Sequence, residues 1–285
     1  MLKEFARAKV NLTLDVLSKR ADGYHEVSSI LQMLELCEEV ELKKNSRGII
    51  LKVDATKISG GETVPHDEKN LAWRAAEEVQ KFCGKNLGVA ISLVKKIPAQ
   101  AGLGGGSADA AAVIRGMNRL YELNLTDDEL CKIGAQIGSD VPFCIVGGTC
   151  LATGHGEILT RLASIKKFNV VLAKPAGEIS TVWSYKTYDE NPATTHLPTE
   201  KIISRLEREE YDAAFKNFGN LLEDVAIKKI PAIAEYKKKF LAAGARVALM
   251  SGSGPTVFAL TDSDQSAEKI AASVNDAEIF LTKTF

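Results

Sequence analysis

The segment PAQAGLGGGSADAA, residues 98–111, holds four glycines close together, Gly102, Gly104, Gly105 and Gly106. An apolar stretch typical of a β-strand precedes it, and alanines that favour a helix follow it. In that setting, backbone N–H groups and the start of a helix can hold a phosphate. No G-K-[ST] follows and no G-x-G-x-x-G can be placed on the segment, so neither standard phosphate template applies. A flexible surface loop is the alternative, but the strand before and the helix after favour phosphate binding.

Three further positions carry groups that could serve a reaction, although each also has an ordinary structural interpretation. In AKVNLTLDV the residue types alternate, so Lys9 and Asn11 share the polar face of a half-buried strand. A lysine on that face is usually just solvated. Asp140 in GSDVPF fits the cap of a following helical turn. Tyr24-His25 after the Asp22-Gly23 turn offers an aromatic face and a ring nitrogen, but such pairs are often surface decoration.

The elements that must position these residues follow from periodicity. After the strand around residues 8–16, EVSSILQMLEL and EEVELKK are predicted as two strands. A helix capped by Asp67 is expected over residues 68–83, a strand over 88–98 and a helix over 107–123. Thr126 and Glu129 fit a capping box that opens the next helix. The strands GTCLAT and EILTRL complete a predicted first domain, residues 1–160.

Residues 161–285 are predicted to form a second domain. Its order is a strand at FNVVLAKPA, a helix near 180–188, helices up to about 243, the strands ARVALM and TVFALT, a helix and a last strand. This alternation predicts a compact α+β domain with a four-stranded sheet. The fold class expected for the whole chain is α+β.

Composition limits the partners that can be expected. The 285 residues include 36 basic and 37 acidic ones, so no long-range field attracts nucleic acid or an anionic membrane. The five scattered cysteines lack metal-site spacing and are typical of a reduced, cytoplasmic protein. No stretch has the length of a signal peptide core or a membrane span. We expect a monomer or a weak homodimer.

The glycine segment resembles the phosphate loop of the GHMP kinases, whose pattern is P-x-x-x-G-L-G-[SG]-S-[AS]. Pro98, Gly102, Leu103, Gly104, Gly105 and Ala108 match it, while Gly106 and Ser107 vary the serine positions. The segments AKVNLTLDVLSKRADGYHEV and LMSGSGPTVFAL resemble two further motifs of this family, in family order. The resemblance implies a two-domain fold with an N-terminal domain like ribosomal protein S5 domain 2 and a C-terminal ferredoxin-like domain. It also implies ATP as phosphoryl donor, with Mg²⁺ accompanying the nucleotide.

The resemblance assigns roles to individual residues. It implies Lys9 and Asp140 as catalytic residues lying side by side, with Asp140 as the base that orients the hydroxyl and collects its proton. For ATP it implies Asn70 near the adenine, and around the nucleotide Lys95, Lys96, Pro98, Ala99, Gln100, Ala101, Gly102, Leu103, Gly104, Gly105, Gly106, Ser107 and Ala108. For the substrate it implies Lys9, Asn11, Tyr24, His25, Asp140, Thr181 and Tyr185.

Within the family, the N-terminal motif with RADGYH resembles that of members whose acceptor alcohol carries a cytidine diphosphate, and GSDVPF resembles their catalytic segment. The sugar motif of galactokinases is absent. Tyr24 and Tyr185 are then expected to flank the cytosine, with Trp183 as the rival of Tyr185. SGSGPT, residues 251–256, either borders the substrate or is a simple hairpin turn. A kinase of homoserine or mevalonate, and a noncatalytic binding module, are the alternatives.

Overall fold

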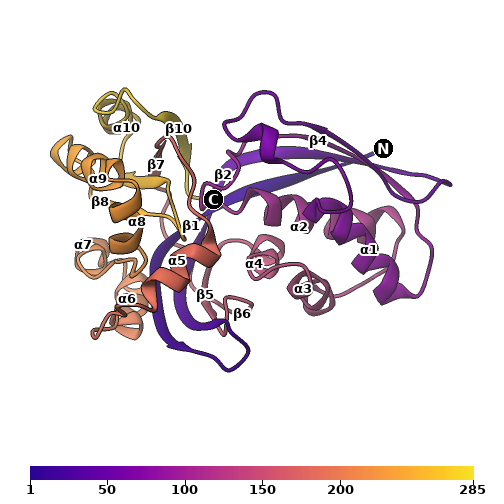
Figure 1. Cartoon of the computed structure of the whole chain (residues 1–285), viewed down its shortest axis with the longest axis horizontal. Helices are drawn as coiled ribbons and strands as arrows, with labels where there is room; N and C mark the ends of the chain where they lie inside the picture. The colour runs from indigo at the N-terminus through magenta and orange to yellow at the C-terminus, as the bar shows by residue number, and fades with distance from the viewer. The chain divides into compact units, whose positions relative to one another are not determined.

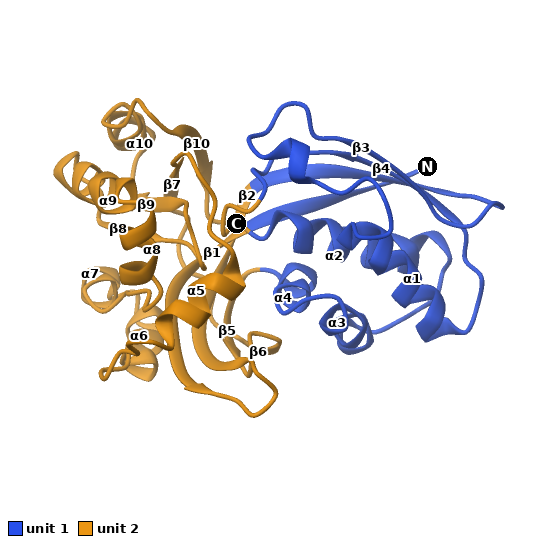
Figure 2. Ribbon diagram, in the orientation of Figure 1, with its two compact units in different colours: residues 1–8, 36–99, 104–147 blue, residues 9–35, 100–103, 148–285 orange.

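The computed structural model describes residues 1–285, which divide into two compact units (Figures 1 and 2). Unit 1 comprises residues 1–8, 36–99 and 104–147, and unit 2 comprises residues 9–35, 100–103 and 148–285. The long strands β1 (Leu2–Lys19) and β2 (His25–Lys44) contribute residues to both units. The domain boundary at residue 160 stays a prediction.

Unit 1 is built from a sheet and four α-helices. Strand β4 (Val89–Val94) pairs in parallel with β3 (Ile50–Asp54) and antiparallel with residues 39–44 of β2. A short 3-10 helix, η1 (Gly61–Thr63), follows β3. The helices are α1 (Leu71–Cys83), α2 (Gly105–Leu120), α3 (Asp127–Ala135) and α4 (Val141–Val146). In Figure 1 these helices lie on one side of the strands.

Two helix caps were predicted in unit 1, at the starts of α1 and α3. The capping box of Thr126 and Glu129 is confirmed at the start of α3. The predicted cap at Asp67 is wrong, because α1 begins later and Asn70 caps it by accepting a hydrogen bond from Ala72 N. Asp67 instead closes the preceding turn, with its carboxylate accepting from Lys69 N and its carbonyl from Asn70 N.

Unit 2 contains a four-stranded antiparallel sheet in the order β10-β7-β9-β8. Its strands are β7 (Asn169–Lys174), β8 (Val247–Met250), β9 (Val257–Thr261) and β10 (Glu278–Lys283). Strands β5 (Thr149–Thr153) and β6 (Ile158–Arg161) pair antiparallel beside residues 29–32 of β2. The helices are α5 (Thr181–Tyr188), α6 (Thr199–Glu207), α7 (Tyr211–Phe215), α8 (Glu223–Lys229), α9 (Ala232–Ala242) and α10 (Asp264–Ala271). The predicted α+β class and four-stranded sheet are confirmed.

Two predictions about the first strands need correction. EVSSILQMLEL and EEVELKK form the single strand β2, because no turn residue interrupts them. Strand β1 is not half-buried: Lys9, Asn11, Thr13 and Asp15 on its polar face are no more than 5% exposed. Burying a polar group costs free energy unless the group makes hydrogen bonds, so these four side chains are expected to have hydrogen-bond partners inside the protein.

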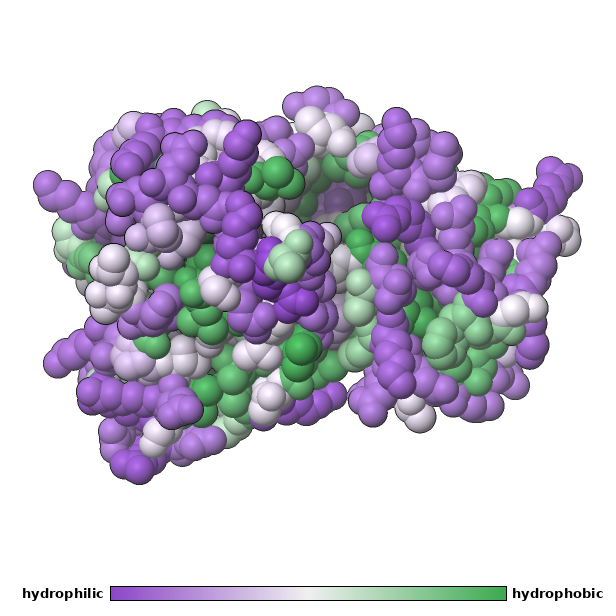
Figure 3. Space-filling model, turned by 60° about the horizontal axis from the view of Figure 1, so that its bottom comes forward, coloured by the Kyte–Doolittle hydropathy of each residue, from purple (hydrophilic) through white to green (hydrophobic).

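Hydrophilic residues cover most of the face drawn in Figure 3, with hydrophobic residues in small patches between them. Exposed large hydrophobic side chains, such as Phe5, Ile158 and Val182, are spread along the sequence. None of the helices combines the length and the apolarity that crossing a membrane requires.

Candidate active site

Residues 100–103 of the glycine segment lie in unit 2, against strand β1 and the SGSGPT turn. Leu103 accepts a backbone hydrogen bond from Lys9 N at 3.0 Å, and Gly102 accepts one from Ser251 Oγ at 2.9 Å. Gly102 has a φ of 75°, and a Cβ placed there would lie 2.2 Å from Ser251 O. Only glycine fits such a close approach of two backbones. SGSGPT is therefore more than a hairpin turn, because it packs on the glycine segment.

The second half of the segment begins helix α2 in unit 1. Gly104 is left-handed at the N-cap, and the first helical bond runs from Ala108 N to Gly104 O. The amides of residues 105–107 precede that bond and so have no carbonyl partner within the helix. A Cβ at Gly105 would lie 3.2 Å from Ile97 Cγ2, and one at Gly106 would lie 3.3 Å from Leu71 Cδ1. The missing side chains keep this first turn compact.

A buried ionic cluster supports the segment from within unit 1. Lys95 Nζ donates to Glu38 Oε2 at 2.6 Å and to Asp109 Oδ2 at 2.5 Å. Glu38 Oε1 accepts from Lys96 N and Ile97 N, where the chain leaves β4. The side chains of Lys95, Glu38 and Asp109 are all less than 5% exposed. The cluster therefore ties β2, the entry of the glycine segment and α2 together.

The cluster has two carboxylates and one ammonium group. Burial, and then the charge of Asp109, raise the pKa of Glu38 to about 8, against the opposing effect of Lys95. Burial would lower the pKa of Lys95, but Asp109 and Glu38 outweigh it and hold that pKa above its usual value. At neutral pH one carboxyl therefore keeps a proton, and the cluster is electrically balanced.

Lys96 and Asn70 are two further residues of unit 1 that are predicted to lie near the nucleotide. Lys96 is exposed, with Nζ 3.8 Å from Glu39 Oε1. Asn70 is buried and already accepts from Ala72 N and donates to Pro65 O. It directly precedes Leu71, which lies beside Gly106, so the starts of α1 and α2 are close together. Lys95 directs its ammonium group into the cluster, which makes it a support of the segment.

Lys9 and Asn11 begin a chain of buried hydrogen bonds in unit 2. Lys9 Nζ donates to Asn11 Oδ1 at 2.8 Å, and Asn11 Nδ2 donates to Ser29 Oγ at 2.8 Å. Ser29 Oγ in turn donates to Thr13 O. A Cβ at Gly252 would lie 3.4 Å from Lys9 Nζ, so SGSGPT also borders this chain. The sequence-based alternative of a merely solvated lysine is thereby excluded.

Asp140 lies in unit 1 at the N-cap position of α4, with helical backbone angles. Its side chain makes no capping hydrogen bond to the helix. The simple interpretation as a helix cap therefore fails. Lys9 belongs to unit 2, so the pairing of the two residues stays a prediction.

The residues expected around a cytosine form two separate ring contacts in unit 2. Tyr24 is 58% exposed, and its ring centroid lies 4.8 Å from that of His155. Tyr185 stacks on His25, with centroids 4.8 Å apart and planes at 26°. Trp183, like Tyr185, packs against the core of unit 2, and Lys229 Nζ lies 4.5 Å from its ring centroid, so the choice between the two residues stays a prediction.

Thr181, at the start of α5, is hydrogen-bonded to Ser253 of the SGSGPT turn, with 2.9 Å between the two hydroxyl oxygens. Asn220 Nδ2 donates to Met250 O and Gly252 O and so holds the same turn. The contacts of Ser253 and Asn220 were not predicted from the sequence, and neither were those of Asp189, Glu38 and Asp109. Acidic residues inside apolar or alanine-rich stretches were the available signal for the last two.

No group of three or more histidine, cysteine, aspartate or glutamate side chains in the chain is placed to hold a metal ion. The hydroxyl of Ser107 lies in the first turn of α2, beside the amides at the start of that helix. Mg²⁺ favours oxygen ligands and few protein groups, so a single hydroxyl here fits a Mg²⁺ ion that arrives on nucleotide phosphates.

The family model for the N-terminal domain of GHMP kinases matches residues 70–148, and the model for their C-terminal domain matches residues 202–278. The 4-diphosphocytidyl-2-C-methyl-D-erythritol kinase of Geobacillus kaustophilus is 45% identical over 93% of this chain and 90% of its own length. The enzyme of that name from Acetivibrio thermocellus is 42% identical over 98% and 97%.

A crystal structure of 4-(cytidine 5'-diphospho)-2C-methyl-D-erythritol kinase is similar with a TM-score of 0.83 and 31% identity, and covers both chains fully. Homoserine kinase from Cytophaga hutchinsonii has a TM-score of 0.78 over 100% of this chain and 94% of its own, at 20% identity, which shows a shared fold. The chain therefore belongs to the GHMP kinase family.

Proposed function

We propose that this protein transfers the terminal phosphoryl group of ATP to the 2-hydroxyl of 4-diphosphocytidyl-2-C-methyl-D-erythritol, in non-mevalonate isoprenoid precursor biosynthesis. The observation that carries this proposal is the 41–45% identity, over at least 93% of the chain, to relatives that bear the name of that kinase. The RADGYH segment, which includes Tyr24 and His25, supports a cytidine substrate over homoserine or mevalonate.

ATP is the phosphoryl donor that membership of this kinase family implies. Its phosphates would bind the amides at residues 104–107, where a left-handed glycine and the helix start supply donors and partial positive charge. The buried cluster of Glu38, Lys95 and Asp109 would hold that loop in place. Mg²⁺ would bind with the nucleotide, through its phosphates and the hydroxyl of Ser107, and would neutralise phosphate charge.

Lys9 and Asp140 are proposed to act on the acceptor hydroxyl. Asp140 would orient the hydroxyl and take its proton late in a loose transition state. The Lys9 ammonium group is held by Asn11 and would stabilise negative charge on the hydroxyl oxygen and the transferring phosphoryl group. The substrate hydroxyl sits on a tertiary carbon, so accurate positioning matters more than nucleophile strength.

Tyr24, His25, Tyr185 and Thr181 are proposed to bind the cytidine end of the substrate. The aromatic rings supply stacking surface, and the ring nitrogen of His25 reads the edge of the base. We further propose that the protein acts in the cytoplasm, as a monomer or weak homodimer, without a nucleic-acid or membrane partner.

A direct assay tests the proposal. The purified protein is incubated with ATP, Mg²⁺ and, separately, 4-diphosphocytidyl-2-C-methyl-D-erythritol, homoserine and mevalonate, and phosphorus NMR detects a new phosphomonoester. We expect product only from the cytidine compound. Turnover of homoserine or mevalonate without turnover of the cytidine compound would overturn the proposal.

A further inference from the structure

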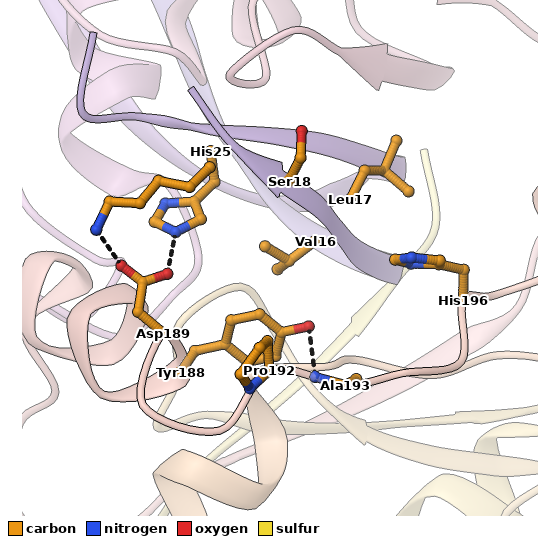
Figure 4. Close-up of a pocket in the computed structure, with 10 residues that line it drawn as sticks. Val16, Leu17, Ser18, His25, Tyr188, Asp189, Pro192, Ala193 and His196 are labelled. Carbon is orange, nitrogen blue, oxygen red and sulfur yellow. Dashed lines mark hydrogen bonds and ion pairs between the residues drawn. The ribbon is translucent and has the colours of Figure 1, made fainter. Parts of the chain in front are cut away.

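Lys19, His25 and Asp189 form a chain of hydrogen bonds beside a pocket of unit 2 (Figure 4). Lys19 Nζ lies 2.5 Å from Asp189 Oδ2, and His25 Nε2 lies 2.6 Å from Asp189 Oδ1. The pocket has a volume of about 470 Å³ and is also lined by Val16, Tyr188 and His196. This volume is typical of sites for small molecules.

Asp189 decides which ring nitrogen of His25 carries the proton. Two cationic or polar donors share its carboxylate; burial would raise the pKa of Asp189, but the hydrogen bonds from Lys19 and His25 outweigh it and hold that pKa low. An ionised carboxylate can only accept, so His25 donates from Nε2. In the neutral ring, Nδ1 is then an acceptor.

The ring of His25 is also held in orientation. Its side chain is 8% exposed, and the ring of Tyr185 stacks on it at 4.8 Å. A flip of the imidazole about its Cβ–Cγ bond would move Nε2 away from Asp189 and break that hydrogen bond. Lys19 occupies the second carboxylate oxygen, so both oxygens of Asp189 are engaged and its carboxylate is also held in orientation.

A fixed acceptor distinguishes the two common pyrimidine bases. Cytosine presents the N4 amino group, a donor, at the position where uracil presents the O4 carbonyl, an acceptor. We propose that Asp189 is a positioning residue that holds His25 Nδ1 as an acceptor and thereby makes the site select cytosine over uracil. This inference rests on the proposed function, because it assumes that His25 reads the base.

Asp189→Asn is the decisive variant. The ammonium group of Lys19 favours the amide oxygen over the amide N–H groups, and with the oxygen on Lys19 the amide nitrogen faces His25. The amide then donates to Nε2, and the proton of the neutral ring moves to Nδ1. Nδ1 becomes a donor, which matches O4 of uracil and opposes the amino group of cytosine.

The measurements are the dissociation constants of cytidine diphosphate and uridine diphosphate by calorimetry, and kcat/KM for the cytidine substrate and its uridine analogue. We expect the wild-type preference for cytosine to fall about 10- to 100-fold in Asp189→Asn, since a mismatched hydrogen bond leaves buried groups unpaired. The tautomer of His25 is read from nitrogen-15 NMR at pH 8.5. Glu190→Gln, which removes the neighbouring exposed carboxylate, is expected to retain the wild-type preference and tautomer.

Equal weakening of both nucleotides in Asp189→Asn would show a structural role only and overturn the inference. An Nδ1–H tautomer of His25 in the wild-type protein would also overturn it, and that measurement needs no variant to fold. The proposed function fails separately, through absence of turnover of the cytidine substrate by the wild-type protein. The binding and NMR measurements do not depend on that turnover.

Discussion

Glu38→Gln is expected to remove a specific pH dependence from the stability of unit 1. Below its pKa, Glu38 is neutral, and glutamine has nearly the same shape. Its amide oxygen can accept from Lys96 N and Ile97 N, as Glu38 Oε1 does. Its amide nitrogen takes the place of Oε2 and can donate toward Asp109, in place of the carboxyl proton, while Lys95 loses its bond to Oε2. The variant should therefore fold, with Lys95 still paired with Asp109.

The direction and size of this pH dependence follow from the pKa of Glu38, which is about 8 in the folded protein against a usual 4.5. Between these values the folded protein holds a proton that the unfolded chain has lost. The free energy of unfolding therefore falls as pH rises, by at most about 1.4 kcal/mol per pH unit. From pH 5.5 to 7.5 the loss amounts to about 3 kcal/mol at most, and the contribution is gone above pH 8.

The assay is urea unfolding at pH 5.5, 6.5, 7.5 and 9, followed by fluorescence in a Trp183→Phe background so that Trp73 of α1 reports on unit 1. The stability of Glu38→Gln relative to the parent should rise steadily from pH 5.5 to 7.5 and then level off. Glu39→Gln is the matched control. The exposed Glu39 has a pKa lowered by Lys3, so it stays ionised throughout this range. Parallel pH curves for Glu38→Gln and its parent would refute the reasoning.

Three further predictions concern the site. Gly102→Ala should lower the free energy of unfolding by at least about 2 kcal/mol more than Gly84→Ala, because both glycines have positive φ but only a Cβ at position 102 would lie 2.2 Å from a backbone oxygen. Urea unfolding measures both costs, and equal costs would contradict the prediction. Tyr185→Ala should raise the KM for the cytidine substrate about tenfold or more and Tyr185→Phe much less, in steady-state assays; equal damage would assign the role to the hydroxyl. Asp140→Ala and Lys9→Ala should each lower kcat about 100-fold or more, while nucleotide binding, measured by calorimetry, persists. A near-normal kcat in Asp140→Ala would show that Asp140 has no part in the mechanism.

The order of the elements could be predicted because it depends on local pattern. Alternation gave strand β1, the Thr126 and Glu129 pair placed the start of α3, and the strand and helix around the glycine segment fixed its setting. The errors were local too. The cap of α1 moved from Asp67 to Asn70 because several residues there can cap and only the packed backbone selects one.

Family membership could also be predicted from the sequence, because three motifs lie in the family's order along the chain. The comparisons confirm that membership. The tertiary structure decided the environment of each functional group. Whether Lys9 is solvated or buried, why Gly102 must lack a side chain, and which carboxylates hold Lys95 and His25 all depend on residues far apart in sequence. Periodicity describes which face a side chain occupies, but burial, pKa and tautomer depend on what packs against that face, and only the folded chain brings those groups together.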